Sequence, residues 1–117
     1  MQDNVIRTKS FQFAVRVADC CRALIEQREY VLSKQLLRSG ASIGANVREA
    51  GNANSRKDFA YKLSVALREC DETLFWLELL FASKYIEEPQ FQTLHEKAEE
   101  LMRILTGILK TTRESLK

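Results

Sequence analysis

The segment from Ser55 to Lys84 contains thirty residues without a glycine or a proline. Ser55 stands three residues before Asp58, a spacing that resembles a capping box with the shorter acid and favours a helix start. At ~1.5 Å per residue, an unbroken helix over this segment would approach about 45 Å. A domain of this size does not normally bury so long a helix by itself, so we predict that the segment is the spine of a helical bundle.

Three further segments carry the period of an amphipathic helix. Apolar residues recur at spacings of three and four over about 10–27 and again over about 29–51. A fourth segment begins at Pro89, which suits a first helical turn, and continues to near the C-terminus. With one proline and four glycines, the chain lacks the turn residues that an all-β fold needs. We predict one all-α domain over residues 1–117, an antiparallel up-and-down four-helix bundle.

The N-terminal residues carry charges, including Arg7, Lys9 and Arg16, that interrupt any apolar run. Neither a secretory signal nor a membrane anchor fits this pattern, so we expect a cytoplasmic protein with no membrane partner. Cys20, Cys21 and Cys70 are odd in number and form no CxxC pair. We therefore expect no disulfide framework and no structural zinc, but reduced cysteines that pack in the core.

Charge is unevenly distributed along the chain, although the net charge is only +2. Residues 1–68 carry twelve Lys and Arg against six Asp and Glu, whereas residues 69–117 carry six against ten. This asymmetry indicates either a basic face for an anionic partner or helices of opposite sign that lie beside each other. Both interpretations remain open from the sequence.

Two glycines, Gly40 and Gly44, stand inside the second predicted helix, where each costs up to ~1 kcal/mol relative to alanine. Glycines four residues apart lie on one helical face, so we predict that another helix packs closely against them. A phosphate-binding loop is the alternative, but no Lys-Ser/Thr follows and no strand pattern precedes.

Polar residues form matching strips on the second and third predicted helices. Ser39, Ser42, Asn46 and Glu49 recur at helical spacing on one, and Lys62, Glu69 and Glu72 on the other. We predict that the two strips face each other and hydrogen-bond at the border of the core, with Ser42, Asn46, Glu49, Glu69 and Glu72 as a polar network that fixes helix register.

A carboxylate-bridged metal oxidase is a remote alternative for these strips, since four-helix bundles hold di-iron centres. His95 is the only histidine, however, and lies outside any Glu-x-x-His arrangement, so we predict no metal site and an exposed His95. With one histidine and no GxSxG motif, no nucleophilic triad can be built. We expect a protein that is not an enzyme and needs no cofactor.

Seven of the eight residues from Leu74 to Phe81 are large and apolar, which covers almost the whole circumference of a helix. One core cannot absorb all of them. We predict that Phe75, Trp76 and Leu79 form a subunit interface, with an intramolecular aromatic cluster as the alternative.

Basic residues gather around the joint between the second and third predicted helices. The nucleic-acid-binding candidates are Arg48, Arg56, Lys57, Lys62 and Arg68. A solvated helix face is the alternative, because no aromatic residue is clearly interleaved as a base-stacking platform.

Positions 36–80 resemble the four-helix bundle proteins named for intervening sequences in bacterial large-subunit ribosomal RNA. The resemblance is carried by these blocks, in the order and spacing of that family: Ser42-Ile43-Gly44-Ala45-Asn46, Arg48-Glu49-Ala50, Ser55 with Lys57-Asp58-Phe59, Lys62-Leu63, Glu69, Glu72-Thr73 and Trp76-Leu77-Glu78-Leu79-Leu80. The resemblance implies a left-handed up-and-down bundle that assembles into a homopentameric ring, and no catalytic residues.

More distantly, the chain is similar to accessory proteins of diversity-generating retroelements, which are basic pentamers that bind a reverse transcriptase and nucleic acid. This chain is nearly neutral, unlike those proteins. The leading hypothesis is a homo-oligomer that binds RNA, DNA or a nucleic-acid-processing protein. The second hypothesis is a structural protein–protein adaptor without nucleic-acid binding.

Overall fold

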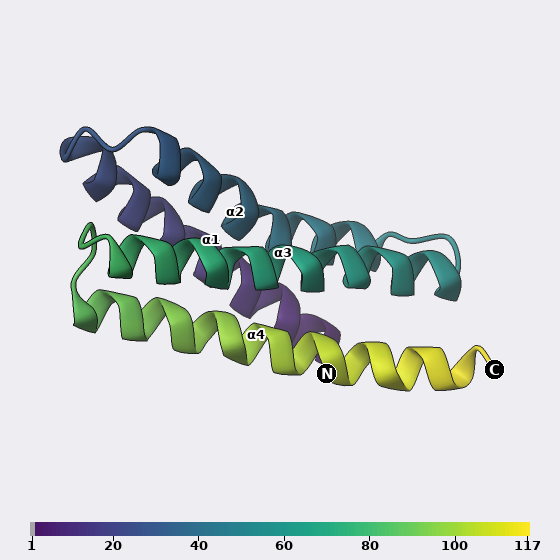
Figure 1. The fold of residues 1–117 in the computed structure, drawn as a ribbon. Coiled ribbons are helices and arrows are strands. Elements are labelled where there is room, and N and C mark those ends of the chain that lie inside the picture. The colour runs from purple at the N-terminus through teal and green to yellow at the C-terminus, as the bar shows by residue number, and fades with distance from the viewer. Residues whose placement is uncertain (1) are drawn as a thin grey trace.

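The computed structural model describes the chain from residue 2 to residue 117, and its side chains from residue 5 onward. These residues form four helices and no strand: α1 (Gln2–Glu26), α2 (Val31–Gly51), α3 (Arg56–Ala82) and α4 (Glu88–Ser115). Successive helices run antiparallel, so both termini lie toward the same end of the bundle (Figure 1). The predicted all-α up-and-down four-helix bundle is confirmed.

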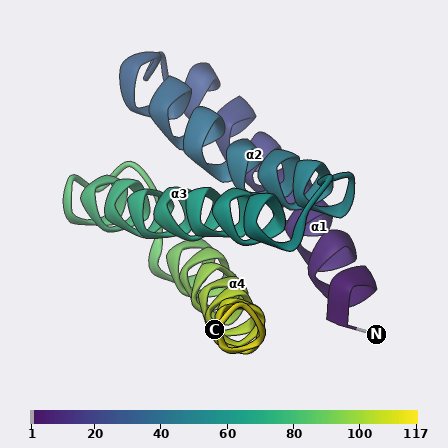
Figure 2. The ribbon, with the colours of Figure 1, turned by 90° about the vertical axis from the view of Figure 1, so that its right-hand side faces the viewer.

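The helices pack in a closed order around one core. α1 packs on α2, α2 on α3, α3 on α4, and α4 returns to α1 through the least extensive of the four contacts. In Figure 2, α3 lies between α2 and α4. In the view of Figure 1, α1 slopes across the bundle, whereas the axes of α3 and α4 are nearly aligned although the two helices run in opposite directions. The result is an elongated molecule of 48 × 21 × 20 Å.

Side chains at the helix starts satisfy backbone N–H groups that have no partner inside the helix. The Ser55 hydroxyl accepts a hydrogen bond from the Asp58 backbone nitrogen at 3.0 Å, as its spacing predicted. The Glu29 carboxylate caps α2 by accepting from the backbone nitrogens of Leu32 and Ser33, at 2.6 and 3.1 Å. A negative charge at this position also complements the helix dipole.

α1 and α3 end without a glycine. Arg28 and Lys84 follow these helices in the left-handed backbone region, with φ of 64° and 66°. The next backbone nitrogens, of Glu29 and Tyr85, bond back to the carbonyls of Leu24 and Leu80, both at 2.9 Å. These bonds satisfy helix-terminal carbonyls and offset the cost of the left-handed residue.

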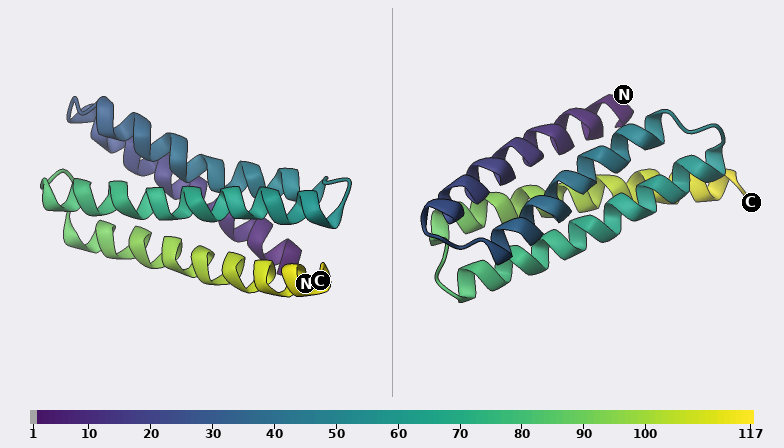
Figure 3. Two further views of the ribbon diagram at one scale, coloured as in Figure 1. Left: turned by 45° about the vertical axis from the view of Figure 1, so that its right-hand side comes forward. Right: turned by 90° about the horizontal axis from the view of Figure 1, so that it is seen from above.

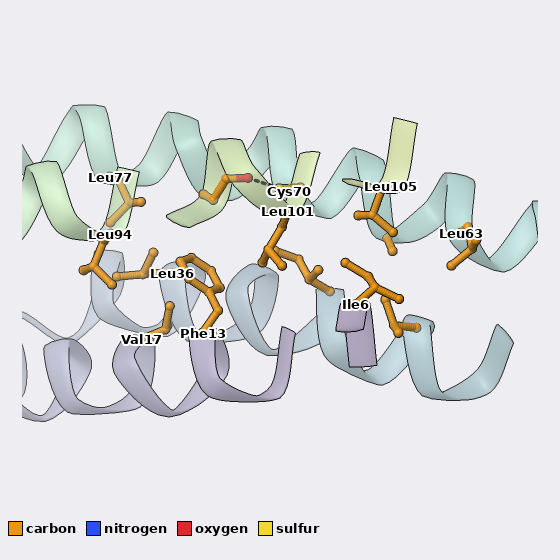
Figure 4. Packing of buried hydrophobic residues seen from close by; sticks show 14 of the residues in the cluster. Ile6, Phe13, Val17, Leu36, Leu63, Cys70, Leu77, Leu94, Leu101 and Leu105 are labelled. Carbon is orange, nitrogen blue, oxygen red and sulfur yellow. Dashed lines mark hydrogen bonds between the residues drawn. The ribbon is translucent and has the colours of Figure 1, made fainter. Parts of the chain in front are cut away.

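The core runs the length of the bundle and draws on all four helices (Figure 4). Its largest fully buried side chains include Phe13 and Leu24 of α1, Leu36 and Ile43 of α2, Leu63, Leu77 and Leu80 of α3, and Leu101 and Leu105 of α4. Burying each such side chain contributes about 1.5–3 kcal/mol relative to exposure. All three cysteines are also buried.

The start of α1 differs from the sequence-based boundary near Ser10. The helix is already formed at Gln2, about two turns before the predicted start, and Ile6, about one turn before it, is buried in the core. The buried face of α1 includes a polar residue, Ser10, which packs against Gly44 of α2. This serine interrupts the apolar pattern in the sequence, so the pattern does not reveal the first turns of the helix.

Candidate nucleic-acid interface

One end of the bundle collects positive charge. The antiparallel order brings together the start of α1, the end of α2, the start of α3 and the end of α4 (Figure 1). Arg48, Arg56 and Lys57, which the sequence marked as nucleic-acid candidates, are exposed at this end. The Arg56 guanidinium donates a 2.7 Å hydrogen bond to the Ser115 hydroxyl, so the first turn of α3 directly contacts the last turn of α4.

The remaining two candidates have different environments. The Lys62 ammonium lies 2.9 Å from the Glu49 carboxylate, and this hydrogen bond, reinforced by the attraction of the two charges, raises the pKa of Lys62. Lys62 is therefore partnered within the bundle and contributes little free positive charge. Arg68 is exposed, and no described carboxylate lies within ion-pair distance of it.

A basic stripe on α4 was absent from the sequence-based candidates. Arg103, Lys110 and Arg113 follow one another at spacings of seven and three residues, which places them on one face of α4 over about 15 Å, and Lys117 stands two residues beyond the helix end at Ser115. All four are exposed, and none forms an ion pair with a carboxylate that the structure describes. We call these residues the α4 stripe.

The α4 stripe borders two shallow grooves between α3 and α4. One groove, of about 480 Å³, is lined by Leu67 together with Lys110, Arg113 and Lys117. The other, of about 430 Å³, contains Arg103 and shares Thr106 with the first. The two grooves therefore adjoin at Thr106, and their α4 side carries four cations together with the carboxylates of Glu99 and Glu114. The spacing of the basic residues was visible in the sequence. Their position beside α3 follows only from the way in which α4 packs against α3.

An exposed aromatic residue interrupts the basic face of α3. Tyr61 is 59% exposed and stands four residues after Lys57 and seven before Arg68, which places the three side chains on the same outward face. The expectation that no aromatic residue is interleaved among these cations is wrong, because Tyr61 is exposed between Lys57 and Arg68. A tyrosine between cations has the composition of a base-stacking surface.

The opposite end of the bundle is predominantly acidic. Its anionic residues come from the end of α1, the end of α3 and the start of α4, and include Glu26, Glu29, Glu78, Glu87, Glu88, Glu96 and Glu99. Charge is thus separated along the long axis rather than between neighbouring helices. The C-terminal third of α4 adds its cations to the basic end, although the sequence half to which it belongs is acidic overall.

The predicted polar network is divided into two separate groups. Glu49 pairs with Lys62, while Glu69 and Glu72 both bind Arg38 of α2, with an Arg38 to Glu69 distance of 3.3 Å. Ser42 and Asn46 instead bond to carbonyls of their own helix, at 2.6 and 2.8 Å. The single network is corrected, because Arg38, which the prediction left out, binds Glu69 and Glu72 in a group separate from the pair of Glu49 with Lys62.

A buried hydroxyl pair joins α2 to α3. The hydroxyls of Thr73 and Ser39 lie 2.9 Å apart, and both residues are fully buried. Thr73 was not among the predicted site residues, because a single threonine inside an apolar run reads as part of the core. The hydrogen bond of this pair joins α2 to α3 at a place that is shielded from water.

The two interior glycines of α2 face α1. A Cβ atom at Gly40 would lie 2.9 Å from Cγ1 of Val17, and one at Gly44 would lie 3.3 Å from the Ser10 carbonyl oxygen. Cβ atoms in proteins essentially never come closer than 3.0 Å to such atoms. The close approach of α1 therefore accounts for a glycine at position 40.

The apolar run of α3 divides between interior and exterior. Phe75 is 56% exposed and packs edge-on against Trp76, with ring centroids 5.0 Å apart. Trp76 is half-buried and donates a 2.9 Å hydrogen bond to Glu72, and Leu79 is also half-buried. Phe81 turns inward and stacks on Phe91 of α4 at 4.4 Å. The run thus contains both an intramolecular aromatic contact and an outward-facing phenylalanine.

His95 is half-buried rather than exposed. Its ring nitrogens lie 3.0 Å from Glu78 of α3 and 3.4 Å from Glu99 of α4. Among the described side chains, no group of three or more His, Cys, Asp and Glu residues has an arrangement that holds a metal ion. No helix among residues 2–117 is long and apolar enough to cross a membrane.

Burial makes the thiols unreactive at neutral pH. It raises the pKa of Cys20 to about 11 and those of Cys21 and Cys70 to about 12. Cys70 donates a hydrogen bond to the Ala98 carbonyl at 3.0 Å (Figure 4), and Cys21 donates one to the Ser33 carbonyl at 3.2 Å. The thiols therefore act as packed, protonated core groups.

Known proteins share both the sequence pattern and the fold of this chain. No curated protein matches it in sequence. A crystal structure from Bacteroides thetaiotaomicron is described as a protein with unknown function from the S23 ribosomal protein family. It is 49% identical, with a TM-score of 0.92, and the match covers 94% of this chain and 99% of that chain. The family model described as 23S rRNA-intervening sequence protein matches residues 2–107. The chain therefore belongs to the 23S rRNA-intervening sequence protein family, as its central motif blocks predicted.

Proposed function

We propose that the chain is a non-enzymatic, self-assembling cytoplasmic bundle that binds RNA, or a ribonucleoprotein, through its basic end. The observation that carries this proposal is the α4 stripe, where three exposed cations on one face of α4 and a fourth just beyond its end have no described ion-pair partners. A row of unpaired cations favours a polyanion, because each contact with a phosphate releases condensed counterions. The family resemblance supports self-assembly and implies five subunits.

Tyr61 favours a single-stranded nucleic acid over a general polyanion. Its ring is exposed beside Lys57 and Arg68, so a base can stack on it while the neighbouring cations contact phosphates. The α4 stripe itself lacks aromatic residues. Binding along the stripe is therefore expected to be insensitive to base sequence and strongly dependent on salt.

The test is binding of a fluorescent single-stranded RNA between about 50 and 200 mM salt. The double change Lys110→Glu with Arg113→Glu should weaken binding and reduce the slope of log affinity against log salt by roughly 1.4, because two phosphate contacts are lost. The matched control, Lys34→Glu with Lys84→Glu, makes the same charge change on exposed lysines at the other end of the bundle. The control should leave the slope unchanged.

Tyr61→Ala separates stacking from charge. It should weaken binding by about 1–3 kcal/mol without changing the salt slope. Tyr30→Ala is the control, because Tyr30 is equally exposed, at 60%, but lies near the acidic end. Native mass with the ultraviolet absorbance ratio of the purified protein reports subunit number and retained nucleic acid together. A monomer at micromolar concentration that binds no RNA at low salt rejects both halves of the proposal.

The exposed Phe75 supports a second candidate, a structural adaptor for a protein partner. Exposed aromatic residues are enriched in protein interfaces. An adaptor predicts stable oligomers whose capture of a protein partner survives charge reversal at Arg56, Lys57 and Lys62. Loss of capture in that variant, together with salt-dependent RNA binding by the parent protein, favours the nucleic-acid function.

A further inference from the structure

Two exposed apolar surfaces lie on different parts of the bundle. α1 and α3 are diagonal to each other: among residues 2–117 no Cα atom of one lies within 8 Å of a Cα atom of the other, and each packs directly on α2 and α4. Seen from above, α1 and α3 form opposite edges of the bundle, with α2 and α4 between them (right panel of Figure 3). Their outward faces therefore point in opposite directions.

The first surface is centred on Phe75 of α3, and we call it the Phe75 face. Asp71 and Glu78 stand four residues before and three residues after Phe75, so all three project outward from one side of the helix. No described cation lies within ion-pair distance of Asp71, and the Glu78 carboxylate contacts only His95. The exposed phenylalanine is thus flanked by two carboxylates along the helix.

Nearby charges leave the Phe75 face negative. Glu72, one turn before Phe75, and Glu69, nearly two turns before it, share the single guanidinium of Arg38, and Arg68, two turns before Phe75, adds one further positive charge. With Asp71 and Glu78, four carboxylates therefore stand against two guanidinium groups around this aromatic centre.

The second surface is a groove between α1 and α4, and we call it the Phe11 groove. It has a volume of about 510 Å³ and follows the least extensive helix contact in the bundle. Phe11 and Val15, one turn apart on α1, line it and remain 58% and 48% exposed. An apolar strip with this i, i+4 spacing is suited to packing against another helix.

The Phe11 groove carries excess positive charge. Two of its charged groups, Lys9 and Glu100, pair with each other at 3.1 Å, and Asp19 pairs with Arg22 at 2.8 Å. The remaining two cations of the lining are Arg16 and Lys97, and neither has an ion-pair partner among the described side chains. The groove is therefore complementary in charge to the Phe75 face.

We infer that the Phe75 face of one copy docks into the Phe11 groove of a second copy. Both surfaces have an apolar centre with charged flanks, and their charges are opposite in sign, which favours this pairing over pairing of either surface with itself. Because the two surfaces are separate on the bundle, each copy can place its Phe75 face in the groove of one neighbour while its own Phe11 groove holds the Phe75 face of another neighbour. The contact is head-to-tail, so assembly continues until the rotation between copies closes a ring. This inference rests on the proposed self-assembly and assigns the surfaces that carry it.

Charge exchange between the two surfaces tests the assignment. Arg16→Glu with Lys97→Glu makes both surfaces acidic, and Asp71→Lys with Glu78→Lys makes both basic. Each double variant should dissociate into single chains, with an apparent dissociation constant raised at least about tenfold. The quadruple variant, in which both surfaces have exchanged sign, should recover the native mass. Sedimentation velocity at low salt measures all four proteins.

Three controls keep the outcomes distinct. Circular dichroism and thermal unfolding must show that each variant remains helical and folded, and Arg103→Glu with Lys110→Glu should not change the mass. An oligomeric parent whose mass is unaffected by either double change, or a quadruple variant that remains monomeric, overturns the surface assignment while self-assembly stands. A parent protein that is itself monomeric instead overturns the proposed self-assembly.

Discussion

Gly40 and Gly107 are both helical glycines, yet their surroundings predict opposite effects of an added methyl group. A Cβ at Gly40 would press on the stiff, fully buried side chain of Val17, whereas a Cβ at Gly107 would meet no atom within 4 Å. Gly107→Ala should stabilise the fold by up to about 1 kcal/mol, because alanine favours the helix. Gly40→Ala should destabilise it by about 1–3 kcal/mol, because overpacking outweighs that gain.

Urea unfolding of the two alanine variants measures this difference directly. The substitution is the same in both, so helix propensity cancels and the difference reports the approach of α1 to α2. Equal stabilisation by both changes would mean that α1 can move away from α2 at no cost.

The buried thiols predict a loss of stability at alkaline pH. In the unfolded chain a cysteine has a pKa of about 8.5, whereas burial raises the folded values to about 11 for Cys20 and about 12 for Cys21 and Cys70. Between those values the unfolded state releases protons that the folded state keeps. The stabilisation is therefore fully present below about pH 8.5 and is lost as pH rises toward the folded pKa, by at most about 1.4 kcal/mol per pH unit for each thiol.

Unfolding free energies measured under reducing conditions from about pH 8.5 to 10 test this expectation. Cys70→Ala removes one of the three titrating thiols, so its free energy of unfolding should fall less steeply with pH than that of the parent. The comparison uses slopes, because the substitution also changes packing at every pH. Parallel slopes would show that Cys70 ionises equally in the folded and unfolded chains.

At the scale of helices, the hydroxyl pair between α2 and α3 predicts a measurable coupling. Thr73→Val and Ser39→Ala each remove one partner of a buried 2.9 Å hydrogen bond. Each should cost about 1–2 kcal/mol, since a buried polar group loses its partner. The double variant should cost less than the sum by about 0.5–1 kcal/mol, measured by urea unfolding in a double-mutant cycle. Additive effects would place the stabilising bond of Thr73 on its own helix, where its hydroxyl also lies 2.7 Å from the Glu69 carbonyl.

The helices themselves follow closely from the sequence, because apolar period and capping chemistry are local properties. Ser55 marked the start of α3, and Pro89 falls in the first turn of α4. The predicted end of the first helix, about residue 27, falls within one residue of the observed end at Glu26, although the residue in the left-handed region that follows is Arg28 rather than glycine. The polarity of Ser10 hid the start of α1, since that serine is buried only through the approach of Gly44. Packing between helices decides where such a boundary falls, and the local sequence pattern carries no information about that packing.

The candidate interface was harder to predict than the fold for the same reason. The sequence placed Lys62 both among the nucleic-acid candidates and in a polar strip facing Glu49, and only the structure shows that Glu49 of the neighbouring helix pairs with it. Conversely, Lys110 and Arg113 lie in the acidic half of the sequence, and only the antiparallel return of α4 brings them to the basic end. Residue type predicts which groups can bind a polyanion, whereas neighbours from other helices decide which of them are free.

At the scale of the whole molecule, charge is separated along a bundle 48 Å long. The proposed contact between copies uses the outward side of α3 around Phe75 and the groove between α1 and α4, whereas the α4 stripe borders the grooves between α3 and α4. Assembly would therefore leave the stripe of every copy accessible. Several equivalent stripes on one assembly can contact a single RNA, which raises its affinity through effective concentration without any new contact.

This arrangement predicts that assembly and phosphate contact can be separated by mutation. Arg16→Glu with Lys97→Glu should yield single chains that bind a long RNA about 10²-fold or more weakly than the assembly, because multivalency is lost. Their affinity for a short RNA that spans one stripe should change much less, since the α4 stripe is intact. Lys110→Glu with Arg113→Glu should do the reverse, keeping the native mass while weakening binding to RNA of either length. Fluorescence anisotropy with the two RNAs, combined with sedimentation, measures both properties. If the monomeric variant bound long and short RNA as tightly as the parent assembly does, one chain would suffice for binding and the assembly would serve another purpose.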